Sequence, residues 1–405
     1  IYENLFFSYI INSLILVLGV SFLSFFLGVT SAWLVSFYRI PFKETLSLLL
    51  ILPIAIPPYA VAYSYADISD NLHNYFFLNV RSEMGAIFIL SITLYPYVFL
   101  ISKYSFLKNA HGIMEAAANL GAKKIELFYK FALPLSRPAI AAAMALVIME
   151  TLADFGVVHF LGVESLSVGI YKAWFGLEDI HSSARLACVL FIFAFFTVFL
   201  EKIFRKKDNE KYVAYGTLNR TDLFQKNKYS PLIFLFILLL ISFFIPIFWL
   251  ITNVVNSESA NDSLIINSLL NTIKLGFLGA MLIVTIALFL AFSKRLFKSS
   301  LSLILNVAKI GYAAPGIVIA IGIIIPVIFI DKKISMIFQY FNFDVGLLIS
   351  SSMIILLLAY IVRFFSVAYN PIEAAYEKIS KKIDFVSANL GASNKRLFFN
   401  IHIPM

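Results

Sequence analysis

Residues 115–122 read Glu-Ala-Ala-Ala-Asn-Leu-Gly-Ala, and residues 387–392 read Ser-Ala-Asn-Leu-Gly-Ala. The letters Ala-Asn-Leu-Gly-Ala are identical in the two stretches and lie 270 residues apart. A proline, Pro134 or Pro404, stands thirteen residues after the glycine of each copy. The duplicated spacing predicts that one structural unit occurs twice in the chain.

The first copy predicts a helix, a turn and a second helix. Residues 108–120 are rich in alanine, the strongest helix former, and Gly121 can adopt the left-handed conformation that ends a helix. The second helix carries Leu127 and Phe128 on an apolar side, and Pro134 ends it. A single copy is equally compatible with a pair of amphipathic helices at a membrane surface. Two copies with the same spacing favour a projecting element that fills a groove on a soluble partner, with Phe128 as an anchor.

The composition places the whole chain in a membrane. Of the 405 residues, 61% are hydrophobic and 14% are charged, whereas a soluble domain is about 45–50% apolar and about 25% charged. These values exclude a soluble enzyme, a disordered chain and a fibrous protein. The single cysteine, Cys188, excludes a disulfide framework, a zinc cage and an iron–sulfur site.

Long apolar runs predict the membrane spans. A bilayer core of about 30 Å requires about 20 apolar residues in a helix. Nine runs satisfy this length: 10–37, 46–66, 84–106, 139–161, 185–204, 231–252, 268–292, 301–330 and 345–369. Because the runs are continuous rather than alternating, they predict helices and not a membrane β-barrel. The predicted fold class is an all-α polytopic membrane protein.

The basic residues predict the orientation of these spans. Most of the 32 lysines and arginines fall in alternate loops on one side of the membrane, which is therefore cytoplasmic. The opposite side holds only five of them: Arg81, Lys172, Arg185, Lys332 and Lys333. The net charge of +9 thus reflects topology and requires no nucleic-acid partner.

The two copies enter from the same side, so the repeat is parallel, with its axis along the membrane normal. We expect a first domain over 1–204, a cytoplasmic linker over 205–230 and a second domain over 231–405. Comparison of the two halves predicts about one further span before residue 1 and two after residue 405 in the complete protein.

The repeated loop resembles the Glu-Ala-Ala loop of permeases from binding-protein-dependent ABC importers. The first copy matches that pattern at Glu115, Ala116, Ala117, Gly121 and Pro134, and Leu133 also agrees.

The second copy keeps Gly391 and Pro404 but departs from the pattern at its start. Phe385 stands at the position of the glutamate, and Asp384 is the nearest acid. Phe398 stands where the first copy has Phe128.

The resemblance implies two tandem type I transmembrane domains in a bacterial inner membrane. It also implies two copies of an ABC ATPase subunit, which dock on the loops, a periplasmic substrate-binding protein, and surrounding membrane lipid. The chain itself would be a transporter subunit and not an enzyme, with no cofactor bound directly. It has no glycine-rich phosphate loop followed by Lys-Ser or Lys-Thr, so ATP would be used by the partner.

Three further stretches, 149–156, 169–175 and 311–316, are similar to sequences in the ferric-iron importer permease group. The implied substrate is therefore ferric iron delivered by the binding protein. Fused permeases for thiamine or phosphonates share this plan and remain alternatives.

Two acids are expected inside the fourth predicted span, Glu150 and Asp154, about one helical turn apart. Acids within a membrane are rare and usually face a cavity or a partner. They can line a path for a cation, form structural hydrogen bonds, or serve as the ion-coupling carboxylates of a secondary transporter. Lys309 is expected to extend to the cytoplasmic surface. The five histidines have no ligand spacing, so no metal site is predicted.

Overall fold

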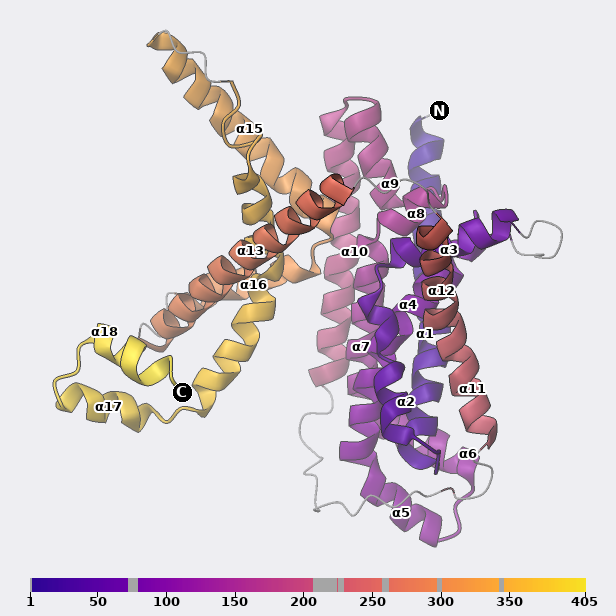
Figure 1. Cartoon of the computed structure of the whole chain (residues 1–405). Helices are drawn as coiled ribbons and strands as arrows, with labels where there is room; N and C mark the ends of the chain where they lie inside the picture. Colours follow the sequence, from indigo (N-terminus) through magenta and orange to yellow (C-terminus); the bar gives the residue numbers. More distant parts are fainter. Residues whose placement is uncertain are drawn as a thin grey trace. The chain divides into compact units, whose positions relative to one another are not determined.

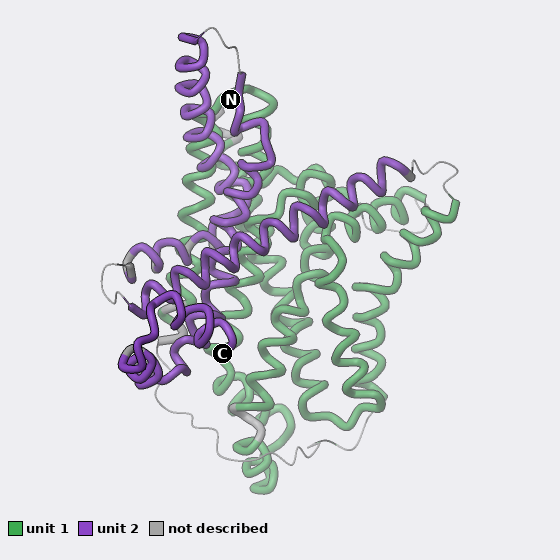
Figure 2. Tube along the Cα trace, turned by 60° about the vertical axis from the view of Figure 1, so that its left-hand side comes forward, with its two compact units in different colours: residues 1–258 green, residues 259–405 purple. Residues whose placement is uncertain are grey.

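The computed structural model describes residues 2–71, 79–206, 224, 229–256, 262–296, 301–341 and 346–405. The predicted linker 205–230 lies almost wholly outside these ranges. Contacts divide the chain into unit 1, residues 1–258, and unit 2, residues 259–405 (Figure 2). This division reflects packing alone, and the domain boundaries given above stay a prediction.

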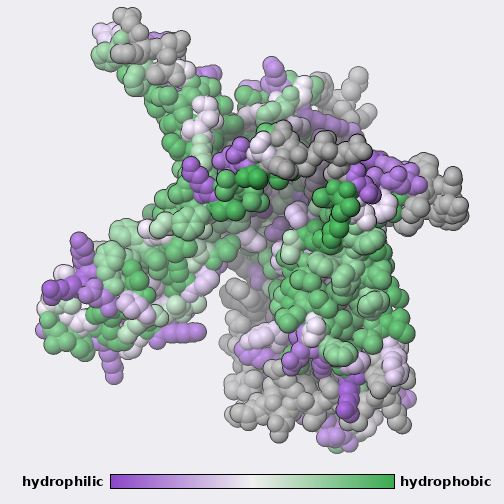
Figure 3. All heavy atoms as spheres, viewed as in Figure 1, coloured by the Kyte–Doolittle hydropathy of each residue, from purple (hydrophilic) through white to green (hydrophobic). Residues whose placement is uncertain are grey.

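Apolar helices dominate the described residues and confirm an all-α polytopic membrane protein. Among the described residues, seven helices are long and apolar enough to span a bilayer, and one bent pair makes an eighth candidate. The candidates are 6–37, 83–108, 124–153, 180–201, 229–256, 263–296 and 353–378, with the bent pair 43–55 and 58–71. In Figure 3, apolar residues cover much of the exposed helix surface, and hydrophilic residues gather toward helix ends.

Several of the predicted spans differ from the structure. Residues 301–330 do not form one helix. The first part is α14 (Leu301–Ala308), followed by a 3₁₀ segment η6 (Lys309–Ala313). A separate helix, α15 (Gly316–Tyr340), begins after Pro315. The fourth span ends at Ala153 rather than at residue 161.

The core of unit 1 is the pair formed by α1 (Tyr2–Phe37) and α4 (Glu83–Ser105), which pack along each other more extensively than any other pair of elements (Figure 1). Two glycines permit this approach. A Cβ on Gly19 would lie 2.6 Å from Ile87, and one on Gly28 would lie 2.5 Å from Val98. Small residues serve this purpose in membrane helices, where the hydrophobic effect does not drive helices together.

The remaining helices of unit 1 surround this pair. Helix α7 (Leu133–Ala153) packs on α4 and on α10 (Ile180–Lys206). Between α7 and α10 lie the short helices α8 (Gly156–Phe160) and α9 (Leu166–Tyr171) and the π-helical turn η4 (Lys172–Gly176).

The second span of unit 1 is broken. Helix α2 (Lys43–Leu49) and the 3₁₀ turn η1 (Leu52–Ala55) meet α3 (Pro58–Asn71) at an angle of 88°. Pro57 and Pro58 lie at the bend, where proline removes backbone donors. The buried hydroxyl of Tyr95 donates to the carbonyl of Leu50, 3.1 Å away, and satisfies an acceptor at the break.

The first span after the linker packs within unit 1. It comprises α11 (Tyr229–Leu239), the π-helical turn η5 (Leu240–Phe244) and α12 (Ile245–Asn256), and α12 packs on α3. The Asp67 carboxylate on α3 accepts hydrogen bonds from Trp249 Nε1 and Asn253 Nδ2, each 2.7 Å long.

Unit 2 is built on α13 (Asp262–Leu296) and α16 (Met353–Lys378). Its small core includes Ala287, Ala291, Leu305, Phe365 and Tyr369. Helices α14 and α15 pack on α16, directly or through η6.

Replacement of Gly28 by alanine should destabilise unit 1, because the added methyl group would meet Val98 and the carbonyl of Tyr95, 2.9 Å away. Overpacking of this kind costs about 1–3 kcal/mol. Thermal unfolding in detergent would measure the loss. Gly276→Ala is the control, since nothing lies within 4 Å of its new Cβ. Equal unfolding temperatures for the two variants would contradict the tight α1–α4 contact.

Candidate functional site

The first repeated loop forms the predicted helix–turn–helix. A π-helical turn η2 (Phe106–Ala110) leads into α5 (His111–Asn119), and α6 (Lys124–Glu126) continues through the π-helical turn η3 (Leu127–Ala132) into α7. Gly121 has a φ of 90°, the left-handed conformation expected of it. The amides of Gly121 and Ala122 donate to the carbonyls of Ala118 and Ala117, both at 3.0 Å, so the turn is a Schellman motif.

The second loop repeats this geometry 270 residues later. Helix α17 (Lys381–Asn389) ends at Gly391, whose φ is 78°, and Ala392 donates to the carbonyl of Ser387 at 3.0 Å. Helix α18 (Asn394–Arg396) and the π-helical turn η7 (Leu397–His402) follow. The two loops therefore share the turn, the helix lengths and the π-helical segment.

Phe128 and Phe398 hold their loops to the adjoining span. The ring of Phe128 lies 5.1 Å from Trp33 of α1, and the ring of Phe398 lies 4.9 Å from Phe292 of α13. Phe128 is only partly exposed, so its ring serves first as an internal anchor for the loop.

Other apolar side chains form the outward surface of the loops. Leu120 is 89% exposed and its counterpart Leu390 is 82% exposed. Tyr129 and Phe399, which also correspond, are exposed as well. Sequence reasoning missed these four residues, although an apolar residue directly before a helix-ending glycine was the available signal.

The remaining predicted loop residues lie on the same elements. Glu115 and Pro134 are partly exposed, Ala116 is exposed and Ala117 is buried. Pro404 is exposed at the end of the second loop. The docking role of all these residues stays a prediction.

Asp384 points inward in the second loop. Its Oδ2 lies 2.6 Å from Nε of Arg295 on α13, and its Oδ1 lies 3.1 Å from Nε2 of His402. By position Asp384 corresponds to Met114, one residue before Glu115, and His402 corresponds to Ala132. Met114 and Ala132 are both fully buried. The second loop thus places a partly buried carboxylate, paired with Arg295, and a buried histidine where the first has apolar contacts.

Arg295 also caps the end of α16. Its guanidinium donates to the carbonyls of Tyr376, Ile379 and Ser380 over 2.8–3.2 Å. These carbonyls lie at or just beyond the end of α16, and the guanidinium donates charge-assisted hydrogen bonds to them.

A second charged cluster lies beside Arg295. Glu373 of α16 accepts from Lys294 Nζ at 2.5 Å and also from Lys309. Lys309, which was expected to extend to the cytoplasmic surface, pairs with the same carboxylate as Lys294 of the last turn of α13, and its ammonium lies 4.9 Å from the centre of the Tyr369 ring.

Asp154 does not share a helical face with Glu150. Helix α7 ends at Ala153, and the Asp154 carboxylate accepts from the amides of Val157 and Val158 at 3.1 and 3.2 Å. Asp154 therefore caps α8, while Glu150 stays on α7 and is partly exposed. Beyond α8's start, the His159 ring stacks on Phe155 with a centroid distance of 4.9 Å. Within the described ranges, no three His, Cys, Asp or Glu side chains are grouped as metal ligands.

Comparison with known proteins agrees with the repeated loop. Residues 24–207 match the family of inner membrane components of binding-protein-dependent transport systems. Over 403 residues the chain is 24% identical to the Fe(3+)-transport system permease protein FbpB 2 of Haemophilus influenzae, covering 97% of this chain and 75% of that protein.

Two shorter similarities involve permeases named for other substrates. The sulfate transport system permease protein CysT of Salmonella typhimurium is 27% identical over 141 residues, 33% of this chain and 51% of that protein. The molybdenum transport system permease protein ModB of Escherichia coli is 26% identical over 137 residues, 32% of this chain and 60% of that protein.

The chain is therefore a multi-pass inner-membrane protein whose residues 24–207 belong to the inner membrane components of binding-protein-dependent transport systems. Within this class its full-length similarity is to the ferric-iron permeases, so the resemblance inferred from the sequence is confirmed. The relatives are transport proteins, in agreement with a transporter subunit rather than an enzyme. Membership of this class implies an ATPase and a periplasmic binding protein as partners.

The second loop should loosen at low pH. Burial lowers the pKa of His402 below its ordinary value of 6.5, and this effect outweighs the opposing attraction of Asp384. Its buried Nδ1 has no partner among the described residues, which explains why protonation is unfavourable. The unfolded loop therefore binds the proton more readily, so the stability from neutral His402 is present above pH 6.5 and is lost as the pH falls.

Hydrogen exchange of residues 384–402, compared with the corresponding residues 114–132 in the same sample, would measure this effect. The first loop is the internal control because Ala132 occupies the place of His402. The protection of the second loop, divided by that of the first, should fall between pH 7.5 and 5.5 by at most about tenfold per pH unit. In His402→Gln this ratio should be independent of pH. A constant ratio in the unmodified protein would refute the expectation.

Proposed function

We propose that this permease imports ferric iron, delivered by a periplasmic binding protein, into the cytoplasm. The observation that carries the importer function is the duplicated loop, with the same left-handed glycine and the same outward leucine in both copies. The similarity to an Fe(3+)-transport permease over nearly the whole chain supports iron as the substrate.

The two loops would dock on two ATPase subunits, one on each. Leu120 and Leu390 would enter an apolar groove of the partner, while Phe128 and Phe398 would transmit its movement to α1 and α13 through their aromatic contacts. ATP would be bound and hydrolysed by the partner alone, and the permease would hold no cofactor.

Sulfate and molybdate are the main competing substrates, because permeases named for sulfate and molybdenum transport match a third of the chain. Thiamine and phosphonates remain alternative substrates, because fused permeases for them share the same two-domain plan. Uptake of radiolabelled iron, sulfate and molybdate by cells with and without the protein would separate these substrates. A secondary transporter would take up substrate without any co-purifying ATPase.

The variant Gly121→Val should weaken ATPase coupling while membrane insertion persists. At a φ of 90° a β-branched side chain is strained by roughly 1–2 kcal/mol, although nothing lies within 4 Å of the new Cβ. Substrate-stimulated ATP hydrolysis by the purified complex should fall about tenfold. Gly112→Ala, in α5 and equally open, is the matched control. Normal coupling in Gly121→Val would argue against docking through this turn.

Glu150 would line the path of the cation, and Asp154 would not. Glu150→Gln should assemble normally but slow iron uptake, since an ionised carboxylate attracts a cation that an amide does not. Asp154→Ala should instead lose about 1 kcal/mol of stability through the lost cap of α8 and keep its uptake per assembled complex. Uptake of radiolabelled iron, normalised to assembled complex, distinguishes the two roles. If Glu150→Gln takes up iron as fast as the unmodified protein, Glu150 does not line the path.

A further inference from the structure

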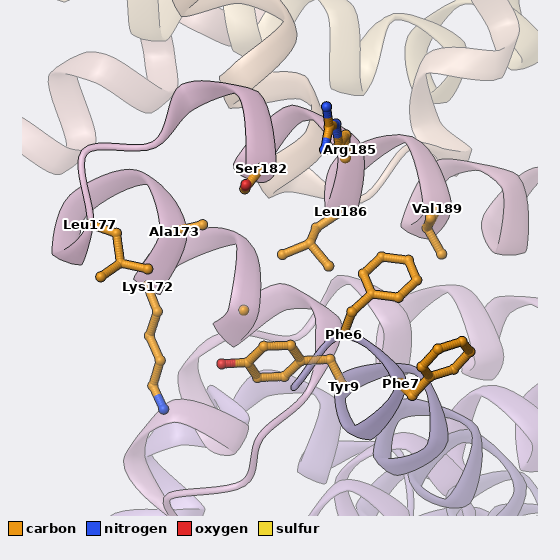
Figure 4. Close-up of a pocket in the computed structure, with 11 residues that line it drawn as sticks. Phe6, Phe7, Tyr9, Lys172, Ala173, Leu177, Ser182, Arg185, Leu186 and Val189 are labelled. Carbon is orange, nitrogen blue, oxygen red and sulfur yellow. The ribbon is translucent and has the colours of Figure 1, made fainter. Parts of the chain in front are cut away.

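A cavity of about 460 Å³ lies in unit 1, where the beginning of α1 meets η4 and the beginning of α10 (Figure 4). Phe6 and Phe7 of α1 and Leu186 and Val189 of α10 form its apolar lining. Lys172 and Arg185 also line it, so the cavity combines an apolar interior with two cations.

The topology places this cavity at the outer surface of the membrane. Both α1 and α10 run toward the cytoplasmic clusters of basic residues, so their first residues lie outside. Helix α10 has 27 residues and a length of about 40 Å, close to the thickness of a bilayer with its head groups. Arg185, five residues into this helix, therefore lies at the depth of the lipid phosphates.

The cations of the cavity are unusual for this side of the membrane. By the charge pattern of the sequence, only five lysines and arginines lie on the outer side of the membrane, and two of them line this one cavity. Lys172 forms an ion pair with Glu164 at 3.2 Å. Asp179 accepts from Ser182 near the start of α10. Within the described part of the chain, Arg185 is exposed and forms no ion pair, so its positive charge remains uncompensated.

The polar and apolar parts of the cavity are separated. Figure 4 shows Lys172 on one side, Phe7 and Val189 on the opposite side, and Arg185 on the turn of α10 at its edge. An exposed apolar stripe continues from Phe7 along α1 toward the cytoplasm, and another follows α10. The stripe residues are Phe7, Ile11, Leu14 and Leu18 on α1, and Ile192, Phe195 and Phe199 on α10.

We propose that this cavity binds one anionic phospholipid of the outer leaflet. Arg185 holds the lipid phosphate, the phenylalanines of α1 contact the glycerol and upper acyl chain, and the chain continues along the apolar stripes. Arginine is suited to this role because its guanidinium donates two parallel hydrogen bonds to a phosphate. The separation of charge and apolar surface matches a lipid better than a free phosphate, which would leave the apolar lining uncovered.

Native mass spectrometry of the purified full-length protein in detergent would test this site. The probes are phosphatidylglycerol and phosphatidylcholine with identical acyl chains, and glycerophosphoglycerol as the head group alone. We expect one phosphatidylglycerol to bind, about fivefold more tightly than phosphatidylcholine, which corresponds to one basic residue near an anionic lipid. Glycerophosphoglycerol should not bind at the same concentrations.

Three variants locate the site. Arg185→Gln should abolish the fivefold preference, whereas Arg81→Gln, on the same side and exposed outside the cavity, should keep it. Val189→Trp, which fills the apolar end, should weaken both lipids equally. The proposal would be overturned if Arg185→Gln kept the full preference for phosphatidylglycerol. It would also be overturned if the unmodified protein bound the two lipids equally, or if the head group alone bound tightly. If Arg185→Gln fails to fold, undiminished binding of both lipids to Val189→Trp would do the same.

Discussion

Every backbone group within a lipid bilayer must find its hydrogen-bond partner inside the protein, because the hydrocarbon core offers no water. This constraint explains the long helices, and it explains why polar side chains lie where helices break. At three helix ends a specific side chain bonds backbone groups. Tyr95 bonds the carbonyl of Leu50, Asp154 caps the amides of α8, and Arg295 bonds three carbonyls at the end of α16. The polar residues of this apolar chain thus gather where helices end.

The two repeated loops show that one backbone geometry can rest on different chemistry. Both have a left-handed glycine, the same hydrogen bond across the turn and a π-helical segment before the next span. Beneath the first loop lie Met114 and Ala132, and beneath the second lie Asp384 and His402 with Arg295. The shared element is therefore the outward shape, which is what a partner would contact, while the supporting core has diverged.

One cluster of charges in unit 2 is compensated locally. Glu373 lies between Lys294 and Lys309, so one carboxylate offsets two ammonium groups. Such pairing keeps polar groups from destabilising the helices, at the cost of fixing them in place. Glu373 also stands in a Glu-Ala-Ala sequence that has no glycine at the required distance. The structure shows why that sequence is not a third loop: its glutamate is turned into the helix contact of α13, η6 and α16.

The sequence by itself determined the membrane class, the helical architecture and the two loops, because apolar length, charge asymmetry and glycine–proline spacing are local properties of the chain. It also gave the correct conformation at Gly121 and Gly391. Tertiary structure alone decided which way the polar side chains point. Asp384, the acid beside the glutamate position of the motif, is partly buried and pairs with Arg295. Lys309 pairs with Glu373. Asp154 was expected on the helix that in fact ends just before it. In each case the partner lies on another helix or beyond a break, and no short-range pattern in the sequence specifies that contact.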